Sequence, residues 1–260
     1  MHSISATDLT KRYGDTVAVD GLDLAVPDGV VYGFLGPNGA GKSTTMRMLT
    51  GLTAPTSGTA TVGGADTRDR PALIDTIGYL PEEPPLHDEL TGREQLTYAA
   101  GLRDLPDGVA RERIADLLDR VDLAEDADTR IDAYSKGMRQ KAAFVQATLH
   151  DPDVLFLDEP TSGLDPRAAR SIREFIDSLA DGGTTVFLST HILPVVDEHA
   201  DTVGVLYDGR LVAEGAPADL KRRADDAEPG DRTLEDVFLE VTAEDPASDA
   251  GEPTDATEAA

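Results

Sequence analysis

The order of apolar and polar residues along the chain predicts an alternation of strands and helices. Residues 2–35 have the short runs typical of strands and turns, and they end in the apolar run VVYGFLG. Further strands are expected at 58–64, 76–81, 153–160 and 184–190, of which 76–81 is a buried strand closed by proline and 153–160 is an apolar strand. Runs that are apolar throughout are typical of strands buried on both faces of a parallel sheet.

Helical periodicity separates these runs. A helix is expected from about Lys42 to Leu49, and residues 90–150 have a mostly helical pattern. Within that region apolar residues recur at i, i+3, i+4 and i+7, namely Ile114, Leu117, Leu118 and Val121. The same spacing marks a helix through Ala168, Ile172, Phe175, Ile176 and Leu179. Thr233 and Asp236 can form a capping box for a last helix, which carries Leu234, Val237, Phe238 and Val241.

This alternation predicts an α/β fold with a mostly parallel sheet and a helical insert at about residues 86–150. We expect the main domain to occupy 1–222 and a helical extension to occupy 223–242. Residues 243–260 have no lysine, arginine or large apolar residue, so they are predicted to be an acidic, disordered tail. No internal repeat is visible.

The composition adds a strong negative charge. The 260 residues include 50 Asp and Glu against 23 Lys and Arg, a formal net charge of −27. The acids are spread along the chain, which resembles the solvated surfaces of proteins from salt-loving cells. An acidic patch for a basic partner is the alternative, but acids cluster visibly only at 122–132 and in the tail. So negative a surface disfavours binding to nucleic acid or anionic lipid.

Other features of the sequence indicate where the chain works. Cysteine is absent, which excludes disulfides and thiolate metal sites. No apolar run reaches the roughly 18 residues that a membrane-spanning helix needs. The first residues, MHSISATDLTKRYGD, contain no apolar signal segment, so we expect a cytoplasmic location.

The stretch GPNGAGKST fits the pattern G-x-x-x-x-G-K-[ST] of a phosphate-binding loop, and it lies between an apolar strand and a predicted helix. Glycines let backbone N–H groups approach phosphates, Lys42 reaches the β- and γ-phosphates, and Ser43 offers a hydroxyl to Mg²⁺. A glycine-rich turn that matches by chance is the alternative. The predicted nucleotide-binding residues are Gly36, Pro37, Asn38, Gly39, Ala40, Gly41, Lys42, Ser43 and Thr44.

Two acids also belong to the predicted nucleotide-binding site. Asp158 and Glu159 end the apolar run VLFLDEP, at the carboxyl end of a buried strand, where ligands bind in open α/β sheets. Asp158 is predicted to hold Mg²⁺ through its water shell, and Glu159 to polarise the attacking water. An ordinary strand end with solvated acids is the alternative, and the phosphate-binding loop makes it less favoured.

Further short motifs occur in a fixed order around these two. They are KRYGD with Tyr13, GYLPEEP with Glu82, YSKGM at 134–138, SGLDP with Asp165, and STH ending in His191. Together the motifs resemble the ATP-binding subunit of an ABC transporter over about residues 4–215. The resemblance implies a P-loop NTPase core with an N-terminal antiparallel β subdomain and a helical insert subdomain.

The resemblance also implies roles within one chain. Tyr13 stacks on adenine, although it is equally suited to pack as a strand residue. Glu82 stands where the family usually has a glutamine that touches Mg²⁺ and water. His191 contacts the γ-phosphate, which makes Glu159, His191 and Lys42 the predicted catalytic residues. The other four histidines have no matching context and are interpreted as structural.

A second set of roles involves another copy of the chain. YSKGM matches the family signature usually written LSGGQ, which begins a helix aimed at the γ-phosphate bound by the partner. Ser135, Lys136 and Gly137 are the residues predicted to meet that phosphate, with help from the helix dipole. The loop through Asp165 crosses the dimer interface in the family.

The signature region also departs from the family. It is rich in bases for so acidic a chain, since Lys136, Arg139 and Lys141 lie within nine residues. An ordinary solvated helix charge is the alternative interpretation for each of them, and it is the stronger one for Arg139 and Lys141. Lys136 and Met138 replace the usual glycine and glutamine, and Glu82 brings an acid close to the metal, which Lys136 can offset. These variants, with the C-terminal RTLEDVFLEVT, resemble the branch that pairs with separate membrane subunits, commonly for export.

The predicted function is therefore that of an ATPase subunit, with ATP and Mg²⁺ as cofactors, that powers transport through separate transmembrane permease subunits. It would act as a homodimer, or as a heterodimer with a similar chain, at the inner face of the membrane. A soluble ABC-type ATPase is the alternative, but those resemble two domains in one chain or carry coiled-coil inserts. A non-catalytic module is disfavoured by the intact Lys42, Asp158, Glu159 and His191, and a GTPase by the lack of N-K-x-D.

Overall fold

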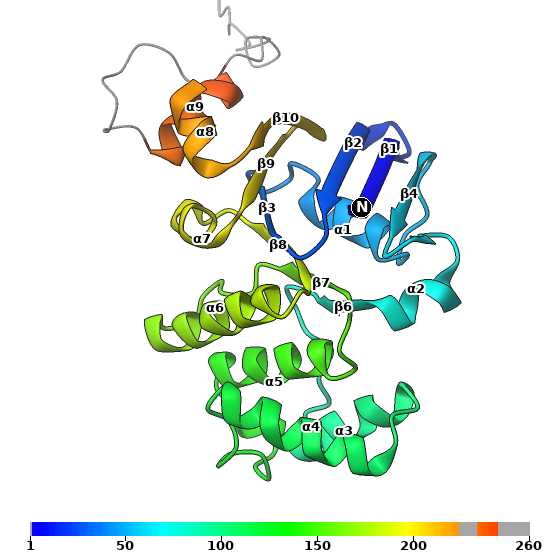
Figure 1. Ribbon diagram of the computed structural model, residues 1–260, viewed down its shortest axis with the longest axis vertical. Coiled ribbons are helices and arrows are strands. Elements are labelled where there is room, and N and C mark those ends of the chain that lie inside the picture. Colours follow the sequence, from blue (N-terminus) through cyan, green and yellow to red (C-terminus); the bar gives the residue numbers. More distant parts are fainter. Residues whose placement is uncertain (1, 224–232, 244–260) are drawn as a thin grey trace, which may run out of the picture.

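A computed structural model describes residues 2–223 and 233–243 (Figure 1). The tail predicted at 243–260 lies outside the described residues, except for Ala243. None of the helices in the described ranges is long and apolar enough to cross a bilayer.

Within the described ranges, the central sheet has six strands, of which only the edge strand β10 is antiparallel. Three of the strands are buried along their whole length, as their apolar sequences predict. In sheet order the strands are β10 (Arg210–Gly215), β9 (Thr202–Tyr207), β3 (Val31–Leu35), β8 (Thr185–Thr190), β7 (Val154–Asp158) and β6 (Ile77–Leu80).

A second, antiparallel sheet covers one side of this core together with the first helix, α1 (Lys42–Leu49) (Figure 1). Its strands, in sheet order, are β2 (Thr16–Pro27), β1 (His2–Tyr13), β4 (Ser57–Val62) and β5 (Ala65–Asp66). Phe187 of the central sheet lies 5.1 to 5.5 Å, between ring centroids, from Tyr32, Phe34 and Phe156. This aromatic cluster belongs to the core that the two sheets share.

Of the remaining helices, α2 contributes Leu73 to the core that the two sheets share, and the others pack on the opposite face or extend away from it. Their bounds are α2 (Arg70–Thr76), α3 (Gly92–Leu102), α4 (Asp107–Arg120), α5 (Lys136–Thr148), α6 (Pro166–Asp181), α7 (Leu193–His199), α8 (Pro217–Arg223) and α9 (Leu234–Ala243), with a 3-10 turn, η1 (Ile131–Ala133), before α5. In Figure 1 the helices α3 to α5 form the end of the molecule farthest from the antiparallel sheet, as expected of the helical insert. A buried apolar cluster joins these helices to α6 and to the central sheet.

The C-terminal helix has the predicted start. The Thr233 amide donates to Asp236 Oδ2 over 2.9 Å, and the Asp236 amide donates to Thr233 Oγ1 over 3.3 Å. Both bonds of the capping box are therefore formed. Leu234 and Val237 are buried beside α7 and β9, which fixes α9 to the core.

Candidate active site

The glycine-rich loop connects β3 to α1, as predicted. Gly41 precedes the helix with a φ of 105°, a conformation that favours glycine. A Cβ atom at this position would lie 2.4 Å from the carbonyl oxygen of Ala18, so a side chain has no space there. The loop therefore turns tightly into a helix N-terminus, whose free N–H groups suit an anion.

Lys42 is buried inside this loop. Its Nζ donates to the carbonyl oxygens of Gly36, over 2.7 Å, and Pro37, over 3.2 Å. Burial lowers the pKa of Lys42, and the nearby carboxylates of Glu159, Asp158 and Glu82 act in the opposite direction. The ammonium thus lies in a partly desolvated site, where its charge acts strongly on an anionic ligand.

Asp158 ends β7 and is only 3% exposed. Burial raises its pKa, while the hydroxyls of Ser43 and Ser189 and the charge of Lys42 favour the ionised form. Its Oδ1 has no hydrogen-bond partner among the described residues, although the atom is fully buried. A buried carboxylate oxygen without a partner and the nearby hydroxyl of Ser43 supply oxygen donors of the kind that Mg²⁺ prefers.

Glu159 follows directly and is held from both sides. His191 Nδ1 lies 2.8 Å from its Oε1, and Thr190 Oγ1 donates to its Oε2 over 3.1 Å. Lys42 Nζ lies 3.9 Å from the same Oε1. The backbone of Glu159 has a φ of 49°, which is uncommon for a residue other than glycine, so the carboxylate occupies a fixed position in a strained turn.

These side chains surround one cleft of about 500 Å³. It is lined by Ala18, Pro37, Asn38, Gly39, Gly41, Lys42, Ser43, Thr44, Glu82, Asp158, Glu159, Ser162 and His191. The structure thus brings together the predicted loop residues, both acids, Glu82 and His191. Gly36 and Ala40 do not line the cleft, but Gly36 accepts the bond from Lys42 and Ala40 is buried.

The other predicted site residues lie elsewhere. Tyr13 is about half exposed at the end of β1, with Lys11 Nζ 5.0 Å from its ring centre. Ser135 caps α5 by accepting from the amide of Met138 over 3.2 Å. Ser135, Lys136, Gly137 and Asp165 do not line the cleft.

Among the remaining bases and histidines of the described chain, several have structural contacts. Arg139 Nη1 pairs with Asp88 Oδ1 over 2.7 Å and donates to the carbonyl of Ile131, which supports its interpretation as an ordinary helix charge. His87, His150 and His199 each contact a side chain or carbonyl outside the cleft, as expected for structural residues.

Three residues of the site were not predicted. Ala18 and Ser162 line the cleft, and Thr190 holds Glu159. Thr190 directly precedes His191, so its hydroxyl at the carboxyl end of a buried strand was an available signal. Ala18 comes from the separate antiparallel sheet, and its position depends on how the two sheets pack.

A buried lysine in a glycine-rich loop, opposite an Asp-Glu pair at the end of a buried strand, defines a P-loop nucleotide hydrolase. Residues 19–162 match the family model described as ABC transporter. The chain therefore belongs to the ABC transporter family, as its ATP-binding and ATP-hydrolysing domain.

Relatives agree with this assignment. The daunorubicin/doxorubicin resistance ATP-binding protein DrrA of Streptomyces peucetius is 44% identical over 220 residues, which cover 84% of this chain and 67% of that protein. The probable multidrug ABC transporter ATP-binding protein YbhF of Escherichia coli (strain K12) is 38% identical over 92% of this chain, but this covers only 41% of YbhF. A solved structure of an ATP-binding subunit of an ABC transporter has a TM-score of 0.84 and 31% identity, covering 92% of this chain and 99% of its own.

Proposed function

We propose that this chain is the ATPase subunit of an export-type transporter whose membrane-spanning part consists of separate subunits, and that it works at the inner face of the membrane. The observation that carries the proposal is the cleft, in which Lys42, Ser43, Asp158, Glu159 and His191 converge. Relatives named for daunorubicin/doxorubicin resistance and for bacitracin transport support export as the direction. Residues 1–222 form the nucleotide-binding domain in this proposal, with 86–150 as its helical subdomain and 223–242 as an extension.

ATP is held by the loop and its lysine. The backbone N–H groups of residues 36–44 surround the phosphates, and Lys42 contacts the β- and γ-phosphates. The cleft is polar and has no large apolar wall, so adenine needs an aromatic surface at its edge. Tyr13, half exposed at the end of β1, is the proposed stacking surface.

The cleft also fits Mg²⁺. Ser43, Asp158 and Glu82 are the residues that would hold it, directly or through water, and the buried Asp158 Oδ1 without a partner supports this choice. Bound there, Mg²⁺ would neutralise phosphate charge. Glu82 makes the site more acidic than a glutamine would, and its charge acts to raise the pKa of Lys42.

Glu159 is the proposed acceptor of the proton from the attacking water. Its carboxylate has lone pairs free besides those used by His191 and Thr190, so it can accept a further hydrogen bond. His191 and Thr190 keep both oxygens oriented, and His191 contacts the γ-phosphate. Catalysis then depends on positioning and charge rather than on a covalent intermediate.

Each working site is proposed to contain two chains, either identical or similar. Ser135, Lys136 and Gly137 lie at the start of α5, away from their own chain's cleft, and the family signature acts on a partner's nucleotide. Asp165 would lie at the same interface. One chain therefore binds ATP in its loop, and the second chain closes the site with its signature.

Mixed mutants test this pairing. Lys42→Ala removes the phosphate ligand but leaves the signature, and Ser135→Arg blocks the signature but leaves the loop. Either homodimer should be nearly inactive. In the mixed dimer both lesions fall in one site, so the other site is wild type and activity should return, to about half per dimer if the sites act independently.

The measurement is ATPase activity in molar KCl, with native mass spectrometry to confirm mixed dimers. Recovery on mixing has no simple explanation within one chain. Mixed dimers that form but show no recovery would count against the two-chain site. Activity in either pure mutant would instead remove Lys42 or Ser135 from its proposed role.

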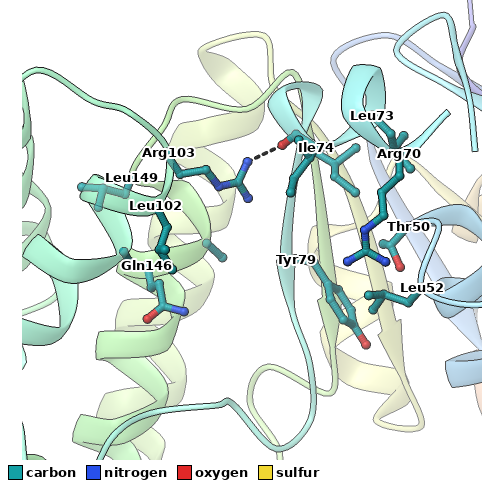
Figure 2. Close-up of a pocket in the computed structure, with 13 residues that line it drawn as sticks. Thr50, Leu52, Arg70, Leu73, Ile74, Tyr79, Leu102, Arg103, Gln146 and Leu149 are labelled. Carbon is teal, nitrogen blue, oxygen red and sulfur yellow. Dashed lines mark hydrogen bonds between the residues drawn. The ribbon is translucent and has the colours of Figure 1, made fainter.

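An apolar groove is the proposed contact for the membrane subunits. It has a volume of about 240 Å³ and lies between α2 and the α3–α5 region (Figure 2). Leu52, Ile74 and Leu102 are 46%, 43% and 68% exposed around it. A neighbouring hollow shares Leu52 with the groove and reaches Pro81 to Pro85, the loop that carries Glu82, so a segment bound here would touch a loop of the ATP cleft.

Two arginines in this groove indicate the chemistry of that segment. Arg103 donates to the carbonyl of Ile74, and Arg70 donates to the carbonyl of Gly51 over 3.4 Å. Neither arginine forms an ion pair with a carboxylate of the described part of the chain, and burial lowers the pKa of Arg103 although the charge of Asp75 acts in the opposite direction. A membrane subunit segment with apolar residues and carboxylates would suit both.

Leu102→Asp and Arg103→Glu should each reduce co-purification of the membrane subunits, because they place negative charge against such a segment. Val212→Asp is a matched control, since Val212 is 41% exposed on β10, far from the groove. Melting temperatures check that all three variants fold. Normal co-purification with both groove variants would exclude this surface, whereas a wild-type chain that co-purifies with no membrane subunit would favour a soluble ATPase.

A further inference from the structure

Lys136, the first residue of α5, lies against the loop between β7 and α6. A Cβ atom added to Gly163 in that loop would be 2.4 Å from Lys136 Nζ and 3.4 Å from its Cε, so the end of the lysine rests on the glycine backbone. Gly163 has a φ of 66°, which favours glycine, and its lack of a side chain leaves the space that the ammonium occupies. No carboxylate within the described ranges forms an ion pair with Lys136.

The placement of this lysine is electrostatically unfavourable for its own helix. A cation at a helix N-terminus opposes the helix dipole, and the first turn of α5 contains no acid to offset it. Lysine is also scarce, with five in 260 residues. Helix stability therefore does not account for Lys136, whereas its contact with the loop gives it a second role.

The loop that Lys136 touches begins with Glu159. Short turns hold it, because the Ser162 amide donates to the Glu159 carbonyl over 3.1 Å and the Leu164 amide donates to the Thr161 carbonyl over 3.3 Å. At its far end, the Asp165 carboxylate caps α6 by accepting from the amides of Arg167 and Ala168. The hydrogen-bonded turn from Glu159 to Ser162 therefore joins Gly163 to Glu159 along the chain.

We propose that Lys136 is a positioning residue that sets Glu159 of its own chain through Gly163. This inference rests on the proposed function, in which Glu159 accepts the proton from water. It gives Lys136 a role within its own chain in place of the contact with the partner's ATP that the family resemblance implies, and it leaves that contact to Ser135 and Gly137. The two roles predict loss of activity at different sites. A positioning role affects the site that uses Glu159 of the substituted chain, whereas the family role affects the site in which the partner binds ATP.

Mixed dimers separate the two roles. A chain with Lys42→Ala inactivates the site that its own loop forms, so the ATPase activity of the dimer comes from the other site, called here the reporting site. The first pair combines Lys136→Met in one chain with Lys42→Ala in the other. The reporting site then uses Glu159 from the Lys136→Met chain. The second pair puts both substitutions in one chain beside a wild-type chain, and its reporting site uses the wild-type Glu159 opposite the signature that carries Lys136→Met.

If Lys136 positions its own Glu159, the first pair should lose about tenfold in kcat, less than the roughly hundredfold that a 1 Å misplacement can cost. KM for ATP should be unchanged, because the loop at 36–44 is intact. The second pair should match wild type mixed with Lys42→Ala. Loss in the second pair, or full activity in the first, would overturn the proposal, whereas a wild-type chain without ATPase activity would instead contradict the proposed function.

A double-mutant cycle in homodimers decides the question if coupling between sites silences the mixed dimers. Gly163→Ala puts a methyl group where the ammonium lies, so its effect on kcat should be smaller in the Lys136→Met background than in the wild type. Additive effects would exclude the contact. Lys136→Arg keeps the cation, so its kcat should be close to that of the wild type, unlike the kcat of Lys136→Met. Lys221→Met removes an equal charge on α8 and should leave kcat unchanged.

Discussion

Burial moves the pKa values of the two central groups of the cleft in opposite directions. It lowers the pKa of Lys42 and raises that of Asp158, so each group is pushed toward its neutral form. Their mutual attraction, and the charge of Glu159 on Lys42, partly offset this effect. The site therefore holds charges at a cost in stability, which a phosphate and a cation would relieve when they bind.

Asp158→Asn should raise the melting temperature at pH 7.5. The folded-state pKa of Asp158 lies above the ordinary value of 3.8, so the cost of its charge begins near that pH, grows as the pH rises through the folded-state pKa, and is complete above that pKa. The gain over wild type should shrink as the pH falls toward 4, and ATPase activity should be lost.

Asp128→Asn provides the opposite control, because the hydrogen bond from Arg93 lowers the pKa of Asp128. This substitution should destabilise slightly at pH 7.5. Melting curves at several pH values are the measurement. An Asp158→Asn variant that melts below wild type at pH 7.5 would contradict the inferred cost.

Glu159→Gln should retain ATP binding and lose most turnover. The amide has nearly the same shape but cannot take a proton from water, and general-base catalysis contributes roughly 10²- to 10⁴-fold. Nucleotide binding and steady-state hydrolysis, measured on the same sample, separate the two effects. Near-normal hydrolysis with intact binding would remove Glu159 from the role of base.

At the scale of elements, the sequence pattern predicted the strands and loops whose residues are contiguous in the chain. The buried strands β3, β7 and β8 each contain a short apolar run, and the loop before α1 is contiguous. Residues 90–150 were predicted only as mostly helical, because Leu123, Ala127 and Ile131, which are buried in the break between α4 and α5, are spaced four residues apart like the buried face of a helix. Neither the contact of Lys136 with Gly163 nor the reach of Ala18 to the cleft has a local signature, since both depend on tertiary packing.

Thr233→Ala should loosen α9. The substitution removes the side-chain bond to the Asp236 amide, and loss of such a cap costs about 1 kcal/mol. Hydrogen exchange in 234–240 should become faster, while exchange in the central sheet stays unchanged. Thr233→Ser keeps the cap and should behave as wild type; equal exchange in the Ala and Ser variants would show that the capping box contributes nothing.

At the scale of the molecule, the charge of −27 dominates. The ion pairs of the described surface, such as Arg93 with Asp128 or Arg170 with Glu174, are exposed and worth little individually. Because the chain has 50 Asp and Glu but only 23 Lys and Arg, most acids have no base of their own even if every base pairs with one acid. Self-repulsion among these carboxylates is therefore balanced mainly by ions from the solvent.

The melting temperature should accordingly rise with KCl. The screening length falls from about 30 Å at 0.01 M salt to about 3 Å at 1 M, which weakens repulsion between surface charges. Sucrose at equal osmolality controls for general exclusion effects and should stabilise less. A melting temperature that is flat across this salt range would reject the proposal that the chain is adapted to high salt.

The strained turn at Glu159 affects which residues selection for stability or for turnover would retain at this position. Among the described residues other than glycine, positive φ angles occur at Asp8, Asp104, Asp122, Asp151, Asp208 and Glu159. Aspartate is several-fold enriched in this conformation, whereas glutamate has no such preference. A library of variants sorted for thermal stability alone should therefore discard glutamate at 159 in favour of glycine, asparagine or aspartate, and one sorted for turnover should keep it.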